Sequence, residues 1–113
     1  MLLFAGVIFV ASSFSIDGPE ELIPHFDKIV HLTIYGVLSF LLYRAFRGTF
    51  PKASFLGIAL WTFLLTVAYG ASDEFHQSFV PYRDSDIFDL LSDSLGAILV
   101  LSLLFARERS EVP

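Results

Sequence analysis

Four apolar blocks dominate the sequence and constrain its fold more than any other feature. Each block is nearly free of charged residues, and a helix that crosses a membrane needs about 20 mostly apolar residues. The last two blocks reach that length, the second reaches it when the charged residues at its two ends are included, and the first is at the lower limit. The blocks are residues 1–16, 29–43, 53–71 and 87–106. The sequence therefore predicts an all-α, polytopic membrane protein, a bundle of four transmembrane helices.

The composition agrees with this class of protein. The 113 residues are 55% hydrophobic and only 17% charged, and a water-soluble domain of this size needs more polar residues to cover its surface. The length suits a single domain over residues 1–113. The sequence has no cysteine, which excludes disulfides and thiolate chemistry. The helices are expected at about 1–16, 28–46, 53–73 and 86–106.

The first block has a second interpretation. An apolar stretch followed by small residues, here "ASSFS" at 11–15, is also found in cleaved signal peptides. The block lacks the basic residues that begin a signal peptide, and no soluble domain follows it. We therefore expect a retained first helix.

The charged residues are divided between the two sides of the predicted bundle. The connection after the second block and the C-terminal tail hold five of the seven basic residues, whereas the other side holds ten of the twelve acids. Short loops rich in Lys and Arg remain cytoplasmic. We therefore expect both termini to be cytoplasmic and both acidic connections to lie outside. The five basic residues are Arg44, Arg47, Lys52, Arg107 and Arg109.

Polar residues at the outer ends of the second and third helices are spaced to share a helix face. Asp27, His31 and Tyr35 follow one another at intervals of four, so that Asp27 is predicted to hold the His31 ring and Tyr35 to reach one turn deeper. Glu74 and Gln77 are three residues apart where the third helix leaves the membrane. Two of the predicted helices thus present polar faces at the same surface.

The fourth helix begins with a third polar face. Asp86, Asp89 and Asp93 lie on one side of it, and Asp93 is beyond the reach of the favourable helix dipole. An ionisable group within the membrane costs about 2.5–3.5 kcal/mol on insertion scales, so it faces the bundle interior or water. We expect the three faces to enclose an outward-facing polar pocket rimmed by Lys28 and Arg83.

Each of these residues also has an ordinary structural explanation. Asp86 can cap a helix, and a polar network can simply hold four helices together. Taken one at a time, the residues favour that interpretation. The complete set exceeds what assembly requires, and ionisable residues within a membrane mark functional sites by default, so we interpret the set as a site.

The same residues carry a family resemblance over nearly the whole chain. "DKIVHLTIY" at 27–35 resembles the DK-x-x-H motif of the VanZ-like family. "DEFHQSFVPYRDSDIFDLLSDSLG" at 73–96 resembles its second motif, DE-x-x-Q-x-F-x-P-x-R-x-x-D-x-x-D. One departure is Asp93, where the family pattern usually shows Asn. The matching residues of the second motif are Asp73, Glu74, Gln77, Phe79, Pro81, Arg83, Asp86, Asp89 and Gly96.

The resemblance implies a small bacterial integral membrane protein of four helices, which we expect in the plasma membrane with its site on the outer side, as the distribution of charge indicates. The name-giving member is linked to resistance to teicoplanin, a glycopeptide that acts on cell-wall precursors outside the membrane. The resemblance therefore implies a role in the cell envelope, without fixing a reaction.

One functional hypothesis is an enzyme that hydrolyses or transfers the headgroup of a lipid or a lipid-linked cell-wall precursor. His31, set by Asp27, would be the general acid or base, and Glu74 with Asp86 a second acid–base pair. Arg83 and Lys28 would hold phosphate. The candidate catalytic residues are His31, Asp27, Glu74, Asp86 and Asp89, and the candidate substrate-binding residues are Arg83, Lys28, Gln77, Tyr35 and Asp93.

A second hypothesis is a non-catalytic protein that binds lipids or assembles with other membrane proteins and uses the polar network for recognition or structure. A third is a divalent metal site, for which the sequence shows no compact motif, so that no resident cofactor is predicted. The residues that offer ligands are His31, Asp27, Glu74, Asp86, Asp89 and His76.

Other functions are disfavoured. Ion conduction requires polar residues through the whole bundle, and the inner halves of the helices hold only scattered ones such as Ser39, Thr62 and Ser102. The net charge of −5 and the absence of a basic patch disfavour nucleic-acid binding. Four short helices bury little surface among themselves, which makes a homodimer an open alternative.

Overall fold

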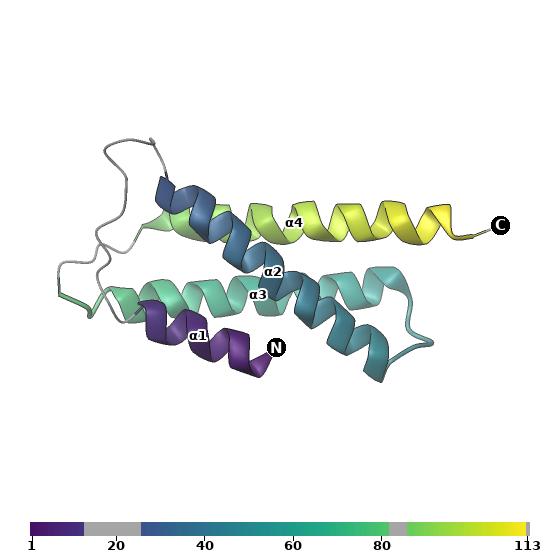
Figure 1. Ribbon diagram of the computed structural model, residues 1–113, viewed down its shortest axis with the longest axis horizontal. Coiled ribbons are helices and arrows are strands. Elements are labelled where there is room, and N and C mark those ends of the chain that lie inside the picture. Colours follow the sequence, from purple (N-terminus) through teal and green to yellow (C-terminus); the bar gives the residue numbers. More distant parts are fainter. Residues whose placement is uncertain (13–25, 82–85, 113) are drawn as a thin grey trace.

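The computed structural model describes residues 1–12, 26–81 and 86–112, which contain four α-helices and no strand. Figure 1 shows three long helices side by side and a short one against them. The all-α prediction is confirmed. The helices are α1 (Leu2–Ser12), α2 (Phe26–Thr49), α3 (Phe55–Gln77) and α4 (Ile87–Ser110).

The three long helices are each long and apolar enough to cross a membrane. They contain 24, 23 and 24 residues, or about 35 Å of helix, against a hydrocarbon core of about 30 Å. Large apolar side chains such as Leu56, Trp61 and Leu103 lie on their outer surface with more than half of their area exposed, as expected for helices in contact with lipid. Three of the four predicted spans are thus confirmed as candidates.

The described part of α1 is shorter than a span. Its 11 residues correspond to about 16 Å, roughly half of the hydrocarbon core. It packs on α2 and α3 through Ile8, which is buried beside Tyr35 and Leu38, and the Tyr69 hydroxyl donates a hydrogen bond to the Ala5 carbonyl. The helix therefore supports the bundle near the end of α3.

The long helices extend beyond the expected apolar segments. Ser54 caps α3 by accepting a hydrogen bond from the backbone of Gly57, and Asp86 caps α4 by accepting one from Phe88 at 2.9 Å. At its other end α3 continues through Gln77 because its last polar side chains point inward, where they find partners.

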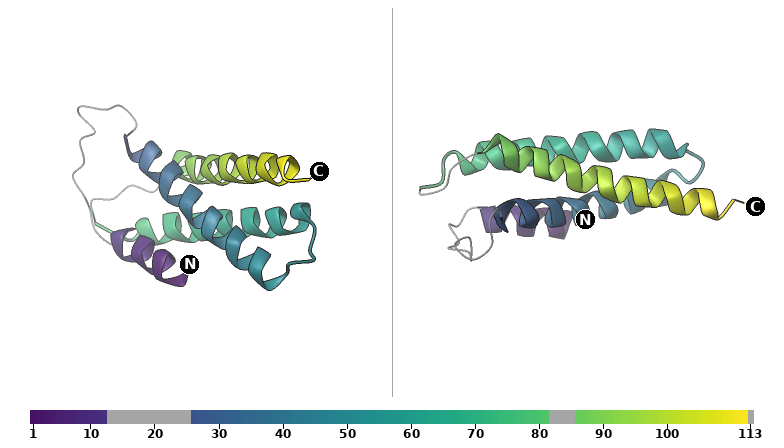
Figure 2. Two further views of the ribbon diagram at one scale, coloured as in Figure 1. Left: turned by 45° about the vertical axis from the view of Figure 1, so that its right-hand side comes forward. Right: turned by 90° about the horizontal axis from the view of Figure 1, so that it is seen from above.

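Gly96 sets the close approach of α2 and α4. A Cβ atom on Gly96 would lie 2.2 Å from the Leu32 carbonyl oxygen and 3.0 Å from the backbone nitrogen of Gly36. Only glycine allows the two backbones to meet at this distance. Figure 2 shows α2 crossing α4 obliquely, so the glycine contact determines which α4 residues face α2.

The two ends of the bundle differ in charge. The first turn of α2, the last turn of α3 and the first turn of α4 meet at one end of the 52 Å long axis (Figure 1), and this end holds the acidic cluster. At the opposite end Arg47 pairs with Glu108 at 2.6 Å, and the Tyr43 hydroxyl also donates to Glu108. The predicted separation of acidic and basic ends is present in the structure.

Candidate functional site

Three helices bring a set of polar side chains together beneath the acidic end. Each of them is buried, with less than a tenth of its surface exposed. Their positions follow the helical spacings seen in the sequence, so the predicted convergence of three polar faces is found. The set comprises His31 and Tyr35 of α2, Asp73, Glu74 and Gln77 of α3, and Asp89 and Asp93 of α4.

The His31 ring is held from α4. Its Nδ1 atom lies 2.9 Å from Asp93 Oδ1, and its Nε2 atom lies 3.7 Å from Asp89 Oδ2. The predicted pairing with Asp27 is wrong, because Asp27 lies in the first turn of α2 with 40% of its side chain exposed and binds Lys28. The glycine contact between α2 and α4 brings Asp93 to the ring instead.

Lys28 is enclosed by carboxylates. Its Nζ atom lies 2.8 Å from Asp27 Oδ2, 2.8 Å from Asp86 Oδ2 and 2.6 Å from Asp89 Oδ1. An ammonium group has three N–H donors, and these three contacts use them all. The predicted role of Lys28 in holding phosphate is therefore disfavoured. Arg83, the other predicted phosphate ligand, lies outside the described residues.

Asp86 has two structural tasks. Hydrogen bonds from Lys28 and from the backbone of Phe88 hold the pKa of its carboxyl below the usual range. Its backbone N–H donates to Glu74 Oε2 at 3.0 Å, which joins the end of α3 to the start of α4. Glu74 and Asp86 are thus in contact as predicted, but through the backbone of Asp86, so this contact leaves no proton shared between two carboxylates.

Asp73 forms a buried centre that sequence reasoning left without a role. Its Oδ2 atom accepts a hydrogen bond from the Tyr35 hydroxyl at 2.9 Å and one from Gln77 Nε2 at 3.1 Å. Tyr35 and Gln77 are each 1% exposed and Asp93 is fully buried. In the structure these three residues bind protein groups, and their contact with a substrate stays a prediction.

A sequence signal could have identified Asp73. Small and polar residues recur along α3 at intervals of three or four, which places them on one face. All of them are buried. The residues of this face are Thr62, Thr66, Gly70, Asp73 and Gln77.

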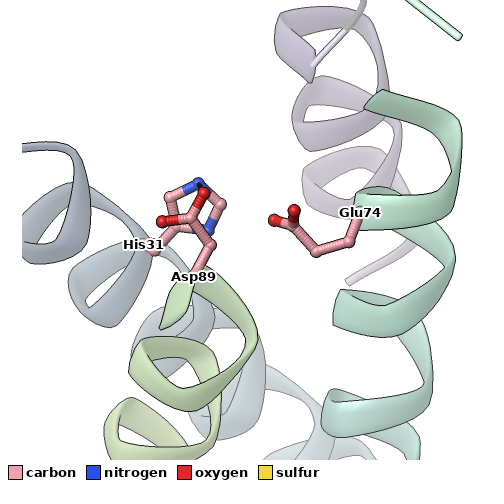
Figure 3. Close-up of side chains that lie close together, drawn as sticks. All are labelled: His31, Glu74 and Asp89. Carbon is pink, nitrogen blue, oxygen red and sulfur yellow. Dashed lines mark ion pairs between the residues drawn. The ribbon is translucent and has the colours of Figure 1, made fainter. Parts of the chain in front are cut away.

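One group of side chains has the composition and spacing of a metal site. His31, Glu74 and Asp89 each present one ligand atom, and these atoms lie within 4.8 Å of one another. Figure 3 shows the Glu74 carboxylate pointing from α3 toward the His31 ring and the Asp89 carboxylate, which lie together. His76, which the sequence also offered as a ligand, is stacked on Phe9 with ring centroids 4.6 Å apart.

Several buried oxygen atoms have no hydrogen-bond partner among the described residues. Two of them are Asp73 Oδ1 and Asp93 Oδ2. Gly70 makes room for the latter, since a Cβ atom there would lie 2.7 Å from it. Buried carboxylate oxygens without partners are costly, so these oxygens call for a proton, a water molecule or a cation that the described contacts do not supply.

A pocket of about 700 Å³ opens beside this cluster. Charged side chains line the part at the acidic end, and Phe88, Leu91 and Leu95, which are exposed on the outer surface of α4, line the part that follows this helix away from that end. One wall of the pocket is therefore polar and the other wall is apolar. Its polar residues are Asp27, Lys28, Asp86 and Ser92.

Comparison with known proteins agrees with the motifs. The family model described as VanZ/LLP1 matches residues 1–107. A protein of Schizosaccharomyces pombe named "Uncharacterized protein C11E3.10" is 30% identical over 107 residues, which cover 93% of this chain and 64% of the relative. The chain thus spans less than two thirds of that relative's length. No solved structure matches. With a family match over nearly its whole length, this chain belongs to the VanZ/LLP1 family.

Proposed function

We propose that this protein is an integral protein of the bacterial plasma membrane that binds the headgroup of a lipid or a lipid-linked cell-wall precursor and modifies it by hydrolysis or transfer. The observation that carries the proposal is the pocket with one charged and one apolar wall. A molecule with a polar head and an apolar chain matches both walls, and the open lipid-facing surface allows it to enter from the side.

The chemistry of the proposed reaction rests on His31. Asp93 fixes one nitrogen of the ring at 2.9 Å, which leaves the second nitrogen facing Asp89 and Glu74. A ring held in this way can accept a proton from a water molecule or a hydroxyl group and later return it. Glu74, on the opposite side of the group (Figure 3), would hold the nucleophile or the leaving group.

The proposed side of action follows from the distribution of charge. Arg44, Arg47, Arg107 and Arg109 lie at the end of the bundle away from the cluster. Positively charged connections favour the cytoplasm, so the cluster would open outward, where cell-wall precursors are exposed. The proposed link to teicoplanin resistance follows from this position and from the family resemblance.

A test in lipid nanodiscs addresses binding and chemistry together. The purified protein is incubated with labelled phospholipids and lipid-linked precursors, and native mass spectrometry measures bound lipid while chromatography measures headgroup release or transfer. The His31→Gln variant should lose about 10²–10⁴-fold in rate and still bind lipid through the apolar wall of the pocket. The matched controls are His76→Gln, whose ring stacks on Phe9 of α1, and Glu111→Gln, at the opposite end of the bundle.

Other outcomes of this test would contradict the proposal. No headgroup change in any lipid, with lipid still bound, would eliminate the catalytic part and leave a lipid-binding protein. If the protein shows no lipid binding and no turnover, the alternative is favoured, namely that the polar network only holds the helices together. The internal contacts of the network also support that alternative. In cells, expression in a sensitive bacterium should raise the teicoplanin concentration needed to stop growth, and His31→Gln should remove the effect.

A further inference from the structure

We infer that His31, Glu74 and Asp89 form a binding site for one divalent transition-metal ion. The three residues come from α2, α3 and α4, and are 43 and 15 residues apart in sequence, yet one ligand atom of each lies within 4.8 Å of the other two. They are therefore not a local run of acids but a convergence that only the folded bundle produces (Figure 3).

The ligand set identifies the class of ion. One imidazole and two carboxylates suit Mn²⁺ and Zn²⁺, whereas Mg²⁺ and Ca²⁺ prefer oxygen ligands alone. With metal–ligand distances of about 2.0–2.2 Å, neighbouring ligand atoms lie on the order of 3–4 Å apart. His31 Nε2 and Asp89 Oδ2 are 3.7 Å apart, which is too long for a hydrogen bond and suits two ligands of one ion.

A residue outside the group orients its histidine. Metal-binding histidines commonly donate their other ring N–H to a carboxylate, which fixes the tautomer and the direction of the ring. Asp93, fully buried, contacts His31 Nδ1 at 2.9 Å. This bond leaves Nε2 to carry the lone pair and directs it toward Asp89. The arrangement is the one that a metal ligand requires.

The balance of charge gives an independent reason for a cation. Six carboxylates lie at this end of the bundle, and among the described residues Lys28 is the permanent cation there. Asp73 Oδ1 and Asp93 Oδ2 are buried without a hydrogen-bond partner in the described part of the chain. Uncompensated charge within a membrane is costly, and a divalent ion would offset it. The carboxylates are those of Asp27, Asp73, Glu74, Asp86, Asp89 and Asp93.

The ion would also give the pocket an attraction for phosphate. All three N–H donors of Lys28 are used by carboxylates, so a phosphate group needs another positive charge, and a metal ion at His31 would supply it next to the pocket. This last step rests on the proposed function, and with an ion bound at its Nε2 atom His31 would act as a ligand, so that the ion would activate the water molecule in place of the ring. The ion site itself rests on the geometry of the three ligands and on the charge of the residues around them.

The test measures metal binding without any lipid. Protein purified in detergent is stripped of metal, titrated with Mn²⁺ alone and followed by electron paramagnetic resonance. We expect one Mn²⁺ per chain, with spin-echo modulation from an imidazole nitrogen. His31→Gln should abolish the nitrogen signal. Glu74→Gln and Asp89→Asn should each weaken binding at least about 10-fold, and Asp93→Asn by about 10–100-fold.

Controls make the result specific. His76→Gln and Glu111→Gln should leave the nitrogen signal and the affinity unchanged, and circular dichroism should show that every variant is helical. If wild-type protein binds neither Mn²⁺ nor Zn²⁺, or if the nitrogen signal persists in His31→Gln, the ion site is refuted. The lipid-binding test, repeated with and without chelator, separates the two proposals: metal binding with no lipid binding sustains the ion site and refutes the headgroup proposal.

Discussion

His31 Nδ1 and Asp93 Oδ1 lie 2.9 Å apart, and this bond joins α2 to α4 in the centre of the polar cluster. Asp93 is fully buried, and its second oxygen faces the space left by Gly70. The pair therefore has a structural task, the attachment of α4 to α2, and a positional one, the direction of the His31 ring.

Replacing Asp93 separates these contributions. Asp93→Ala leaves the buried His31 nitrogen without its partner and should lower the free energy of unfolding by about 1–3 kcal/mol. Asp93→Asn keeps a group that can hydrogen-bond to the ring and should cost less than half as much. Thermal unfolding in detergent, followed by circular dichroism, measures both. Equal stability of Asp93→Ala and wild type would show that the bond contributes nothing.

The glycine contact allows a test of helix packing. A Cβ atom on Gly96 would lie 2.2 Å from the Leu32 carbonyl oxygen, whereas one on Gly48 would have no neighbour within 4 Å. Gly96→Ala should push α2 and α4 apart and cost at least about 1–3 kcal/mol of stability. Gly48→Ala should be neutral or slightly stabilising, because alanine favours a helix. Thermal unfolding of the two variants gives the comparison, and similar values would contradict the close contact.

The His31–Asp93 bond and the Gly96 contact show which features could be predicted from the sequence and which could not. The apolar blocks predicted four spans, three of which are long enough among the described residues, and the spacing of Asp89 and Asp93 predicted a buried polar face, since both signals are local to a single helix. The partner of His31 depends on how α2 and α4 cross, which is set by the contact of Gly96 with the backbone of Leu32 and Gly36. A pattern read along one helix favours the nearest acid, Asp27, and therefore gave the wrong partner.

The dependence on contacts between helices also explains why Lys28 binds carboxylates, although the sequence suggested that it holds phosphate. A basic residue at the rim of a polar pocket suggests a phosphate ligand, and nothing local to α2 indicates otherwise. Two of its three carboxylate partners, Asp86 and Asp89, come from α4 and are 58 and 61 residues away in sequence. Contacts of this kind become visible only when the helices are assembled.

The Lys28–Asp86 contact predicts how stability depends on pH. Its hydrogen bond holds the pKa of Asp86 below the ordinary value of 3.8. A carboxyl with a lowered pKa in the folded state stabilises the fold fully above its unfolded pKa, and that contribution is lost as the pH falls through the folded value. The melting temperature should therefore fall as the pH decreases below about 4. Asp86→Asn should reduce the slope in this window, and the control Glu111→Gln should not.

The proposed orientation can be tested directly because the chain has no cysteine. Single cysteines would replace Ser78, which is exposed at the end of α3 beside the cluster, and Lys52, which is exposed in the connection before α3. In right-side-out membrane vesicles, a membrane-impermeant maleimide should label Ser78→Cys at once and Lys52→Cys only after the membrane is permeabilised. Ser110→Cys, exposed at the end of α4, should behave like Lys52→Cys, because both lie with the basic residues that favour the cytoplasm. The reverse pattern would place the cluster on the cytoplasmic side and remove extracellular precursors as substrates, while leaving the geometry of the His31 site intact.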